Sequence, residues 1–204
     1  MKIAVVIVAL LAGCCSTQTD THIPQRKAQE FRLDIPKNIW EPLFFKTINE
    51  RAKLSNFKSL REGALPDGDL EARIWHGFGL TALEGFVLKR SAGQWSAIHL
   101  QGETPAMAAT ELQRQLPTPK SGWDVCWQRL EETGLLALPD AFAIGCTAFI
   151  NDGMSYVVEF NQAGLYRTYL YYNPEYAKCK EAKQMIQIGN IVAEEFGLPE
   201  MGTK

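Results

Sequence analysis

The residue types best suited to metal chemistry are two histidines in the first half of the chain. His76 and His99 fall on two alternating, strand-like segments. Neutral imidazoles on a sheet can bind a metal ion when a carboxylate lies nearby. These two lack a His-x-x-x-His or His-x-His spacing, so we interpret them as ordinary residues on the face of a sheet. No metal or cofactor is expected from them.

A group of carboxylates just before His76 suggests calcium, because hard cations are held by clustered carboxylate oxygens. Asp67-Gly68-Asp69 and Glu71 supply such oxygens. A calcium loop needs six or more oxygen ligands at an ordered spacing, and no stretch of that length is present. Asp67-Gly68-Asp69 is therefore interpreted as a tight turn before a strand.

Motifs for covalent catalysis and for nucleotide binding are absent from the sequence. There is no Gly-x-Ser-x-Gly motif, and no cysteine has the histidine spacing of a papain-like nucleophile. Gly77-Phe78-Gly79 has no third glycine and no helix start after it, so the dinucleotide fingerprint fails. The sequence favours a non-enzymatic role. An enzyme whose site has no recognisable motif is kept as an alternative.

Composition indicates one folded domain without a nucleic-acid footprint. The 204 residues are 46% hydrophobic, which is enough to form a core, and the formal net charge is −2. A nucleic-acid-binding surface would require a basic patch, which this balance of charge does not supply. No nucleic-acid partner is expected.

The N-terminus has the pattern of an export signal. Lys2 precedes an apolar run, Ile3 to Leu11, and the run ends in small residues before Cys14. Leu11-Ala12-Gly13-Cys14 resembles the bacterial lipobox, where signal peptidase cuts before a lipid-modified cysteine. The resemblance implies that Cys14 becomes a lipidated N-terminus with acyl chains, such as palmitate, that hold the membrane firmly. A spanning helix would need about 20 apolar residues, and polar residues from Ser16 onward interrupt the run.

The expected organisation follows from this cleavage site. Residues 1–13 form the signal peptide, residues 14–30 form the lipidated N-terminus with a flexible tether, and residues 31–204 form a single domain. The resemblance implies a cell-envelope location with the membrane as partner. Cys15, in place of an aspartate after the lipidated residue, favours the outer membrane facing the periplasm in a Gram-negative source.

The expected fold class is α+β: an antiparallel sheet, made of a three-stranded meander plus a hairpin, with helices packed mainly on one face. The spacing of apolar residues predicts these elements. Strands are expected at 31–35, 70–78, 83–90, 94–101 and within the hairpin 153–172, and helices at 41–54, 106–116, 122–133 and 175–196.

The hairpin has a tyrosine-rich second strand. A three-residue loop, Gln162-Ala163-Gly164, would pair Phe160 with Tyr166 and Glu159 with Arg167. In that register Arg167, Tyr169 and Tyr171 lie on the outer face and form a surface for an envelope protein partner. The alternative is that the final helix or the tether covers them.

The cysteines favour one disulfide. With Cys14 lipidated, four cysteines remain, and an extracytoplasmic location permits disulfides. Cys126 lies on the apolar face of a predicted helix and Cys15 lies in the tether, so we predict that Cys146 pairs with Cys179. A loop of this length would contribute about 3–4 kcal/mol.

The segment from Trp123 to Val192 contains the short motifs Leu-Leu-Ala-Leu-Pro-Asp and Tyr-x-Val-x-Phe. Its order of elements resembles that of emfourin, a family of bacterial inhibitors of thermolysin-like metalloproteases. The resemblance implies a protease inhibitor as one function, although no inhibitory residue is carried over. The leading hypothesis is an envelope-anchored, non-enzymatic binding or scaffolding domain. The alternatives are a protease inhibitor and an enzyme with an unrecognised site.

Overall fold

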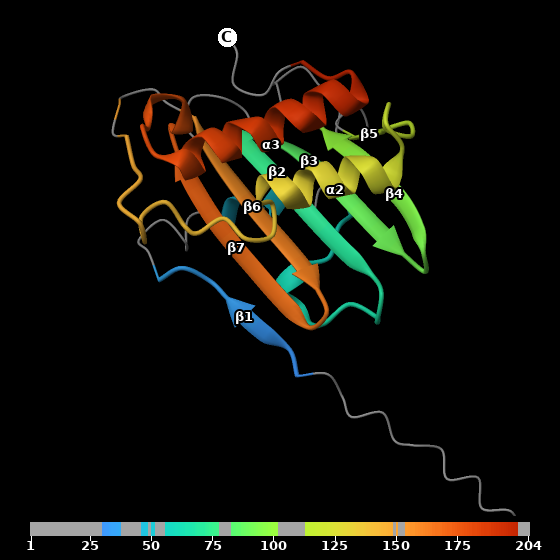
Figure 1. Ribbon diagram of the computed structural model, residues 1–204. Helices are drawn as coiled ribbons and strands as arrows, with labels where there is room; N and C mark the ends of the chain where they lie inside the picture. The colour runs from blue at the N-terminus through green and yellow to red at the C-terminus, as the bar shows by residue number, and fades with distance from the viewer. Residues whose placement is uncertain are drawn as a thin grey trace, which may run out of the picture.

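The protein is described by a computed structural model that covers residues 30–37, 46–48, 50–51, 56–77, 83–101, 113–148, 150 and 154–199. Within these residues the fold is α+β and has a seven-stranded sheet in the order β1-β7-β6-β2-β3-β4-β5 (Figure 1). The strands are β1 Arg32–Asp34, β2 Leu70–Gly77, β3 Glu84–Ser91, β4 Gln94–Leu100, β5 Gln113–Gln115, β6 Ser155–Gln162 and β7 Leu165–Tyr172. The helices are α2 Trp123–Thr133 and α3 Lys180–Phe196, with 3₁₀ turns η1 Leu60–Glu62 and η3 Pro174–Tyr176.

The sheet is mixed, which differs from the antiparallel sheet expected from the sequence. β1 pairs with β7 in parallel, and the other neighbouring strands pair antiparallel. β1 begins beside the β6–β7 loop, where Arg32 N donates to Gly164 O at 2.8 Å, and then runs in the same direction as β7. β1 and β5 are three-residue edge strands. Short strands at both edges limit pairing with other chains.

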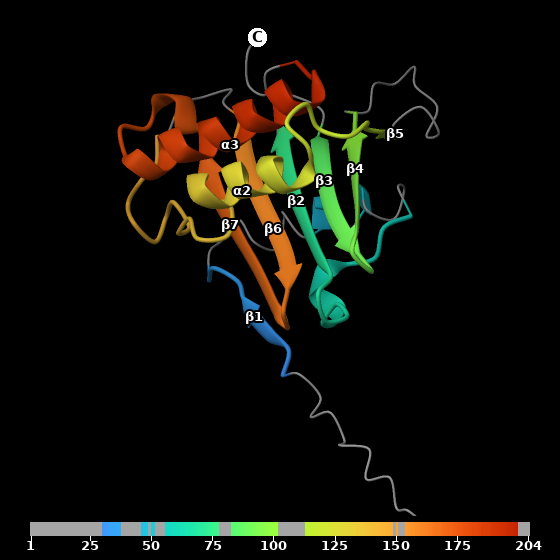
Figure 2. The same cartoon turned by 45° about the vertical axis from the view of Figure 1, so that its right-hand side comes forward.

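Both long helices lie across one face of the sheet, as the two views show (Figures 1 and 2). α2 ends at Gly134, whose φ of 107° is the left-handed conformation that glycine adopts readily. One face of α3 is buried, with apolar or small residues every third or fourth position: Ala182, Met185, Gly189, Val192 and Phe196. Apolar side chains of β2, β3 and β6 complete this core.

The opposite face of the sheet is also covered, by a largely irregular segment. Ile48, in a segment whose described residues 46–48 and 50–51 are helical, packs there with Leu60 of η1. Their partners on the sheet are Trp75, Val87, Leu100, Val157, Tyr166 and Leu170. Trp75 crosses directly over Gly85, where an added Cβ would lie 2.7 Å from the indole ring. Glycine at this position therefore allows the tryptophan to be fully buried.

The β6–β7 hairpin has a different register from the one expected. Its loop contains two residues, Ala163 and Gly164, both with positive φ (49° and 72°). This is the type I′ geometry that matches strand twist. Glu159 therefore lies opposite Thr168, and Phe160 lies opposite Arg167. Because the loop is one residue shorter than predicted, each side chain of β7 exchanges its expected partner for the next one.

Two helix predictions are also corrected. Gln113–Gln115, inside the predicted helix 106–116, forms strand β5 against β4, while residues 102–112 lie outside the described part of the chain. The final helix begins at Lys180 and not near Glu175, because Pro174 opens a separate 3₁₀ turn and Cys179 caps α3.

Candidate functional site

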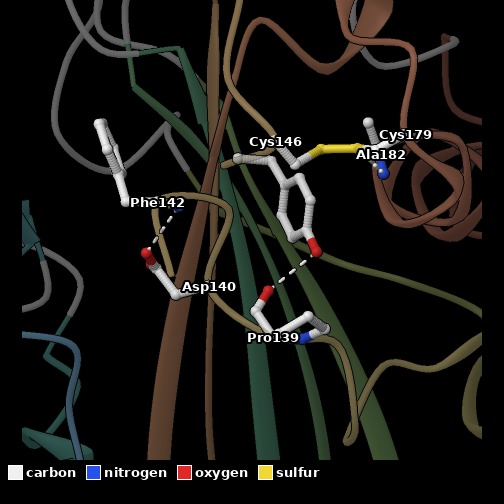
Figure 3. The surroundings of a disulfide bond; sticks show 7 residues. Pro139, Asp140, Phe142, Cys146, Cys179 and Ala182 are labelled. Atoms are coloured by element: carbon white, nitrogen blue, oxygen red, sulfur yellow. Dashed lines mark hydrogen bonds between the residues drawn. A yellow bond between two sulfur atoms is a disulfide. The ribbon is translucent and has the colours of Figure 1, made fainter. Parts of the chain in front are cut away.

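Among the residues that sequence reasoning singled out, Cys14 and Cys15 lie outside the described residues. Cys146 and Cys179 form the predicted disulfide, with their Cα atoms 5.9 Å apart (Figure 3). Cys179 also accepts a hydrogen bond from Ala182 N at 3.4 Å, so the disulfide ties the loop before β6 to the first turn of α3. Cys126 is a buried free thiol, and burial raises its pKa to about 12, which keeps it protonated and unreactive.

The interpretation of Tyr169 and Tyr171 as a partner surface is wrong, because both side chains are buried with 0% exposure. The shorter hairpin loop turns them toward the helix-covered face. Tyr169 Oη donates to Leu135 O at 2.8 Å, and Tyr171 Oη donates to Pro139 O at 2.8 Å. Burial raises the pKa of both phenols. The two hydroxyls fix the irregular segment that follows α2.

Arg167 is also structural and only partly exposed. Its guanidinium donates to Leu136 O at 2.7 Å and to Leu138 O at 2.8 Å. Its Nε lies 2.8 Å from Asp34 Oδ2 of β1. One side chain therefore joins the segment after α2, strand β7 and the edge strand β1. It is committed to the fold and not to a partner.

The two histidines meet one carboxylate at the end of three neighbouring strands. His76 Nε2 lies 3.1 Å and His99 Nε2 lies 3.6 Å from Glu84 Oε2. Hydrogen bonds with the two histidines hold the pKa of Glu84 well below its usual range, and the bond with His76 contributes more than the bond with His99. Within the described ranges, no group of three or more histidine, cysteine, aspartate or glutamate side chains is suited to hold a metal ion. We interpret the cluster as an electrostatic link between β2, β3 and β4.

The face covered by Ile48 and by residues 56–63 contains a buried charge cluster, which the sequence did not predict. Arg73 pairs with Glu71 at 2.6 Å and with Glu159 at 3.3 Å, and all three side chains are almost completely buried. Trp75 Nε1 and Tyr166 Oη also donate to Glu159, at 3.3 Å and 2.9 Å. Burial raises the pKa of Glu159, and Arg73 opposes this shift. The cluster is internally satisfied and closed to a ligand.

The best candidate for a binding site is an open hollow of about 660 Å³, which we call the Trp hollow. It lies where the turn before β2, the β3–β4 turn and the start of α2 meet. Its lining consists of two tryptophans, one arginine, three aspartates and small turn residues: Asp67, Gly68, Asp69, Arg90, Ala92, Gly93, Trp95, Trp123 and Asp124. A volume of this size is typical of small-ligand sites.

The floor of the Trp hollow is rigid. Trp95 and Trp123 are half-buried, and their rings are nearly parallel (6°) with centroids 6.2 Å apart. Trp127 packs against Trp95 with the ring centroids 5.5 Å apart, and Phe196 packs against Trp123 with the ring centroids 6.1 Å apart. Because buried aromatic rings support both tryptophans, the floor is preorganised before any ligand arrives.

The rim of the Trp hollow is held by hydrogen bonds of Asp69. Its carboxylate accepts from Ala92 N and from Ser91 Oγ, each at 2.8 Å. These two bonds lower the pKa of Asp69, the one from Ala92 contributing most. Arg90 Nε donates to Gly68 O at 3.1 Å, and its guanidinium lies 5.3 Å from the ring centroid of Trp95. The Asp67-Gly68-Asp69 turn is thereby fastened to the β3–β4 hairpin.

Sequence reasoning found parts of the Trp hollow but not the site. It predicted the Asp67-Gly68-Asp69 turn and a helix over 122–133, which carries Trp123 and Trp127. Trp127 is buried in the core, at 8% exposure, and Trp123 is partly buried against the same core and stacks on Trp95 of β4. The sequence places Trp95 two residues after the Ala92-Gly93 turn, but its partner Trp123 could be identified only from tertiary structure.

Comparison of the chain with protein-family models, with curated proteins and with solved structures gives no match. Among the described residues, no helix combines the length and the apolar character needed to cross a bilayer.

Proposed function

We propose that this chain is a lipid-anchored bacterial envelope protein whose domain binds a ligand or partner and does not catalyse a reaction. The observation that carries the binding role is the Trp hollow. It joins preorganised aromatic rings to charged side chains in one open site. Its lining contains no serine, cysteine or histidine, the residue types that most often act as nucleophile or base. Recognition is therefore the chemistry that this site supports best.

The proposed anchor is Cys14, at the end of the lipobox-like sequence Leu11-Ala12-Gly13-Cys14. A flexible tether of residues 14–30 would have a root-mean-square length of roughly 20–25 Å. That length would hold the domain close to the membrane and still let it rotate. The Cys146–Cys179 disulfide supports an extracytoplasmic location, because such bonds persist mainly in oxidising compartments. In a Gram-negative source, the proposed location is the outer membrane facing the periplasm.

Membrane fractionation and mass spectrometry test the anchor. The full-length chain should sediment with membranes, and its N-terminal peptide should begin at Cys14 with attached acyl chains. Cys14→Ser should remain uncleaved and should lack the lipid mass, whereas Cys126→Ser should behave like the wild type. An unlipidated wild-type Cys14 would contradict the proposed anchor.

Capture from envelope extracts tests the binding role. The bait is the full-length chain in detergent, compared with Trp123→Leu, which removes an aromatic face but retains apolar contact with Phe196. The matched control is Glu132→Gln, an exposed substitution at the other end of α2. A ligand of the Trp hollow should be captured by wild type and by Glu132→Gln and be depleted with Trp123→Leu. If no captured species depends on Trp123, the Trp hollow is not the binding site.

A further inference from the structure

We propose that the Trp hollow recognises an ammonium group, carried by a larger ligand as a primary or quaternary amine. This inference rests on the proposed binding function and names the ligand class of the same site. It is supported by the charge of the rim, by the aromatic floor and by the position of one internal cation.

The rim carries more negative than positive charge. Three carboxylates, those of Asp67, Asp69 and Asp124, line the Trp hollow together with a single guanidinium, Arg90. Asp69 remains ionised because the Ala92 amide and the Ser91 hydroxyl stabilise its charged form and lower its pKa. Asp124 is exposed in the first turn of α2. The field of these groups attracts a cation and repels an anionic ligand.

The floor supplies the aromatic half of a cation site. Among aromatic side chains, tryptophan binds cations best, when the charge lies within about 6 Å of the ring centroid. Here two nearly parallel indoles present their rings beside the carboxylates. Aromatic cages recognise quaternary ammonium ligands, and a carboxylate beside the rings adds Coulombic attraction for the positive charge.

Arg90 shows that the floor accepts a cation. Its guanidinium already lies 5.3 Å from the centroid of the Trp95 ring, and the Trp123 ring stacks parallel to Trp95 with the centroids 6.2 Å apart. Arg90 therefore competes with a ligand ammonium for the Trp95 ring and for the attraction of the rim carboxylates. Removing its charge should strengthen binding of an ammonium, whereas it should weaken binding of an anion or of a sugar held by the guanidinium. The sign of this effect separates the ligand classes.

The test is a titration of the full-length chain in detergent, followed by tryptophan fluorescence and calorimetry. The first probe pair is choline and its neutral carbon isostere 3,3-dimethyl-1-butanol. The second pair is Nα-acetyl-lysine methylamide and the corresponding norleucine derivative. At least one ammonium probe should bind roughly fivefold to thirtyfold more tightly than its isostere. Choline binding more tightly than the lysine probe would indicate a quaternary headgroup, and the reverse order would indicate a lysine side chain.

Three variants assign the effect to residues. Asp124→Asn and Trp123→Leu should each weaken the preferred ammonium probe at least twofold, and Arg90→Gln should strengthen it by up to about fivefold. Glu132→Gln, at the other end of α2, should leave the affinity unchanged. The proposal is overturned if both ammonium probes match their isosteres or fail to bind. It is also overturned if Arg90→Gln weakens binding, which would indicate an anion or a sugar.

Failure of this inference is distinguishable from failure of the proposed function. If the ammonium probes do not bind but a Trp123-dependent species is captured from envelope extracts, the ligand class is wrong and the binding role stands. If the probes bind with the expected variant dependence but no such species is captured, the ammonium site stands and the proposed role in the envelope is wrong.

Discussion

The two faces of the sheet are stabilised differently. On the face under α2 and α3, the helices contribute an apolar surface, including Cys126, Leu130, Met185 and Ile188, to the main core. The opposite face also has apolar side chains, but Arg73 lies among them at 1% exposure between two buried carboxylates. The helix-covered side also holds a buried carboxylate, Glu195 of α3, but its partners Arg129 and Ser121 lie on α2 and just before it, not on the sheet. Under the irregular cover, by contrast, the charged side chains come from the strands themselves.

The difference follows from the backbone of each cover. In an α-helix the carbonyl groups accept hydrogen bonds from N–H groups of the same helix. The sheet below therefore has to supply apolar contacts but no hydrogen-bond donors. The irregular segment on the other face leaves carbonyl groups that need donors from elsewhere. Arg73 donates to Lys58 O at 2.8 Å, and Asn161 Nδ2 donates to Leu60 O and Gly63 O, both at 2.7 Å.

The same rule applies within the helix-covered face, where residues 135–139 form an irregular cover over β7. Tyr169, Tyr171 and Arg167 donate to carbonyl groups of this segment. The regularity of the covering segment, and not the identity of the face, therefore decides where the sheet needs polar side chains. The Trp hollow lies at the start of α2. Of its charged residues, Asp67 and Asp124 are exposed and Arg90 is partly exposed, whereas Asp69 is buried and hydrogen-bonded.

The largest expected effect is at the charge cluster. Arg73→Leu should lower the free energy of unfolding by about 3–5 kcal/mol, because it leaves Glu159 buried without its counter-charge and leaves Glu71 with the more exposed Lys89, whose Nζ lies 3.7 Å from Glu71 Oε2. Denaturant unfolding measures this loss. Since burial raises the pKa of Glu159, the folded variant binds a proton more readily than the unfolded chain. Its stability should therefore fall as the pH rises from 5 to 8.

Arg90→Leu is the matched control for Arg73→Leu, because Arg90 is at the rim of the Trp hollow and makes one exposed hydrogen bond. Together with the contact of its guanidinium over the Trp95 ring, this gives an expected change in the free energy of unfolding of no more than about 1 kcal/mol. Equal effects of the two substitutions would contradict a special role for the buried cluster.

A somewhat smaller loss is expected under the helices. Leu130→Ala removes a fully buried side chain of α2 and should destabilise the fold by about 3 kcal/mol through lost burial and a cavity. Unlike the loss from Arg73→Leu, this one should not vary between pH 5 and pH 8, because no charge is involved. A pH-dependent loss would show that the two faces are not distinct in this respect.

Single donors to the irregular cover should contribute less. Tyr169→Phe removes one hydroxyl that donates to Leu135 O, and we expect a loss of about 1–2 kcal/mol because the buried carbonyl loses its partner. Amide hydrogen exchange should rise in residues 135–139 more than in α3. Tyr176→Phe, at an exposed tyrosine (65%), is the control and should have no effect.

The smallest predicted effect is at the histidine cluster. Because the pKa of Glu84 is lowered on folding, its contribution to stability is present above the unfolded value near 4.5 and is lost as the pH falls below it. Glu84 is 41% exposed, so solvent screening limits the contribution to less than about 1 kcal/mol. The stability difference between wild type and Glu84→Gln, measured from pH 3 to 7, should therefore shrink below pH 4.5. A difference independent of pH would contradict this role.

Local sequence patterns predicted the regular elements well. Alternation located β2, β3 and β4 to within a residue or two, and the helix expected at 122–133 matches α2. These signals are local, because side-chain periodicity and glycine conformation depend on neighbouring residues. The disulfide was also inferred, by eliminating cysteines with other expected positions.

Long-range pairing could not be read from the sequence. A one-residue difference in loop length reversed the assignment of Tyr169 and Tyr171 from surface to core. The buried cluster joins Arg73 to Glu159, and the Trp hollow joins Trp95 to Trp123, across many intervening residues. Neither pair has a local signal, because tertiary packing alone brings the members together.

The most direct test of the central claim is a map of backbone amide shifts in the full-length chain as choline is added. The account predicts shifts concentrated at 67–69, 90–95 and 123–124, with little change at Arg73, Glu84 or the 135–139 segment. Shifts centred on any of the latter groups would contradict the claim that the Trp hollow is the ammonium site, and so would the absence of saturable shifts with both choline and Nα-acetyl-lysine methylamide.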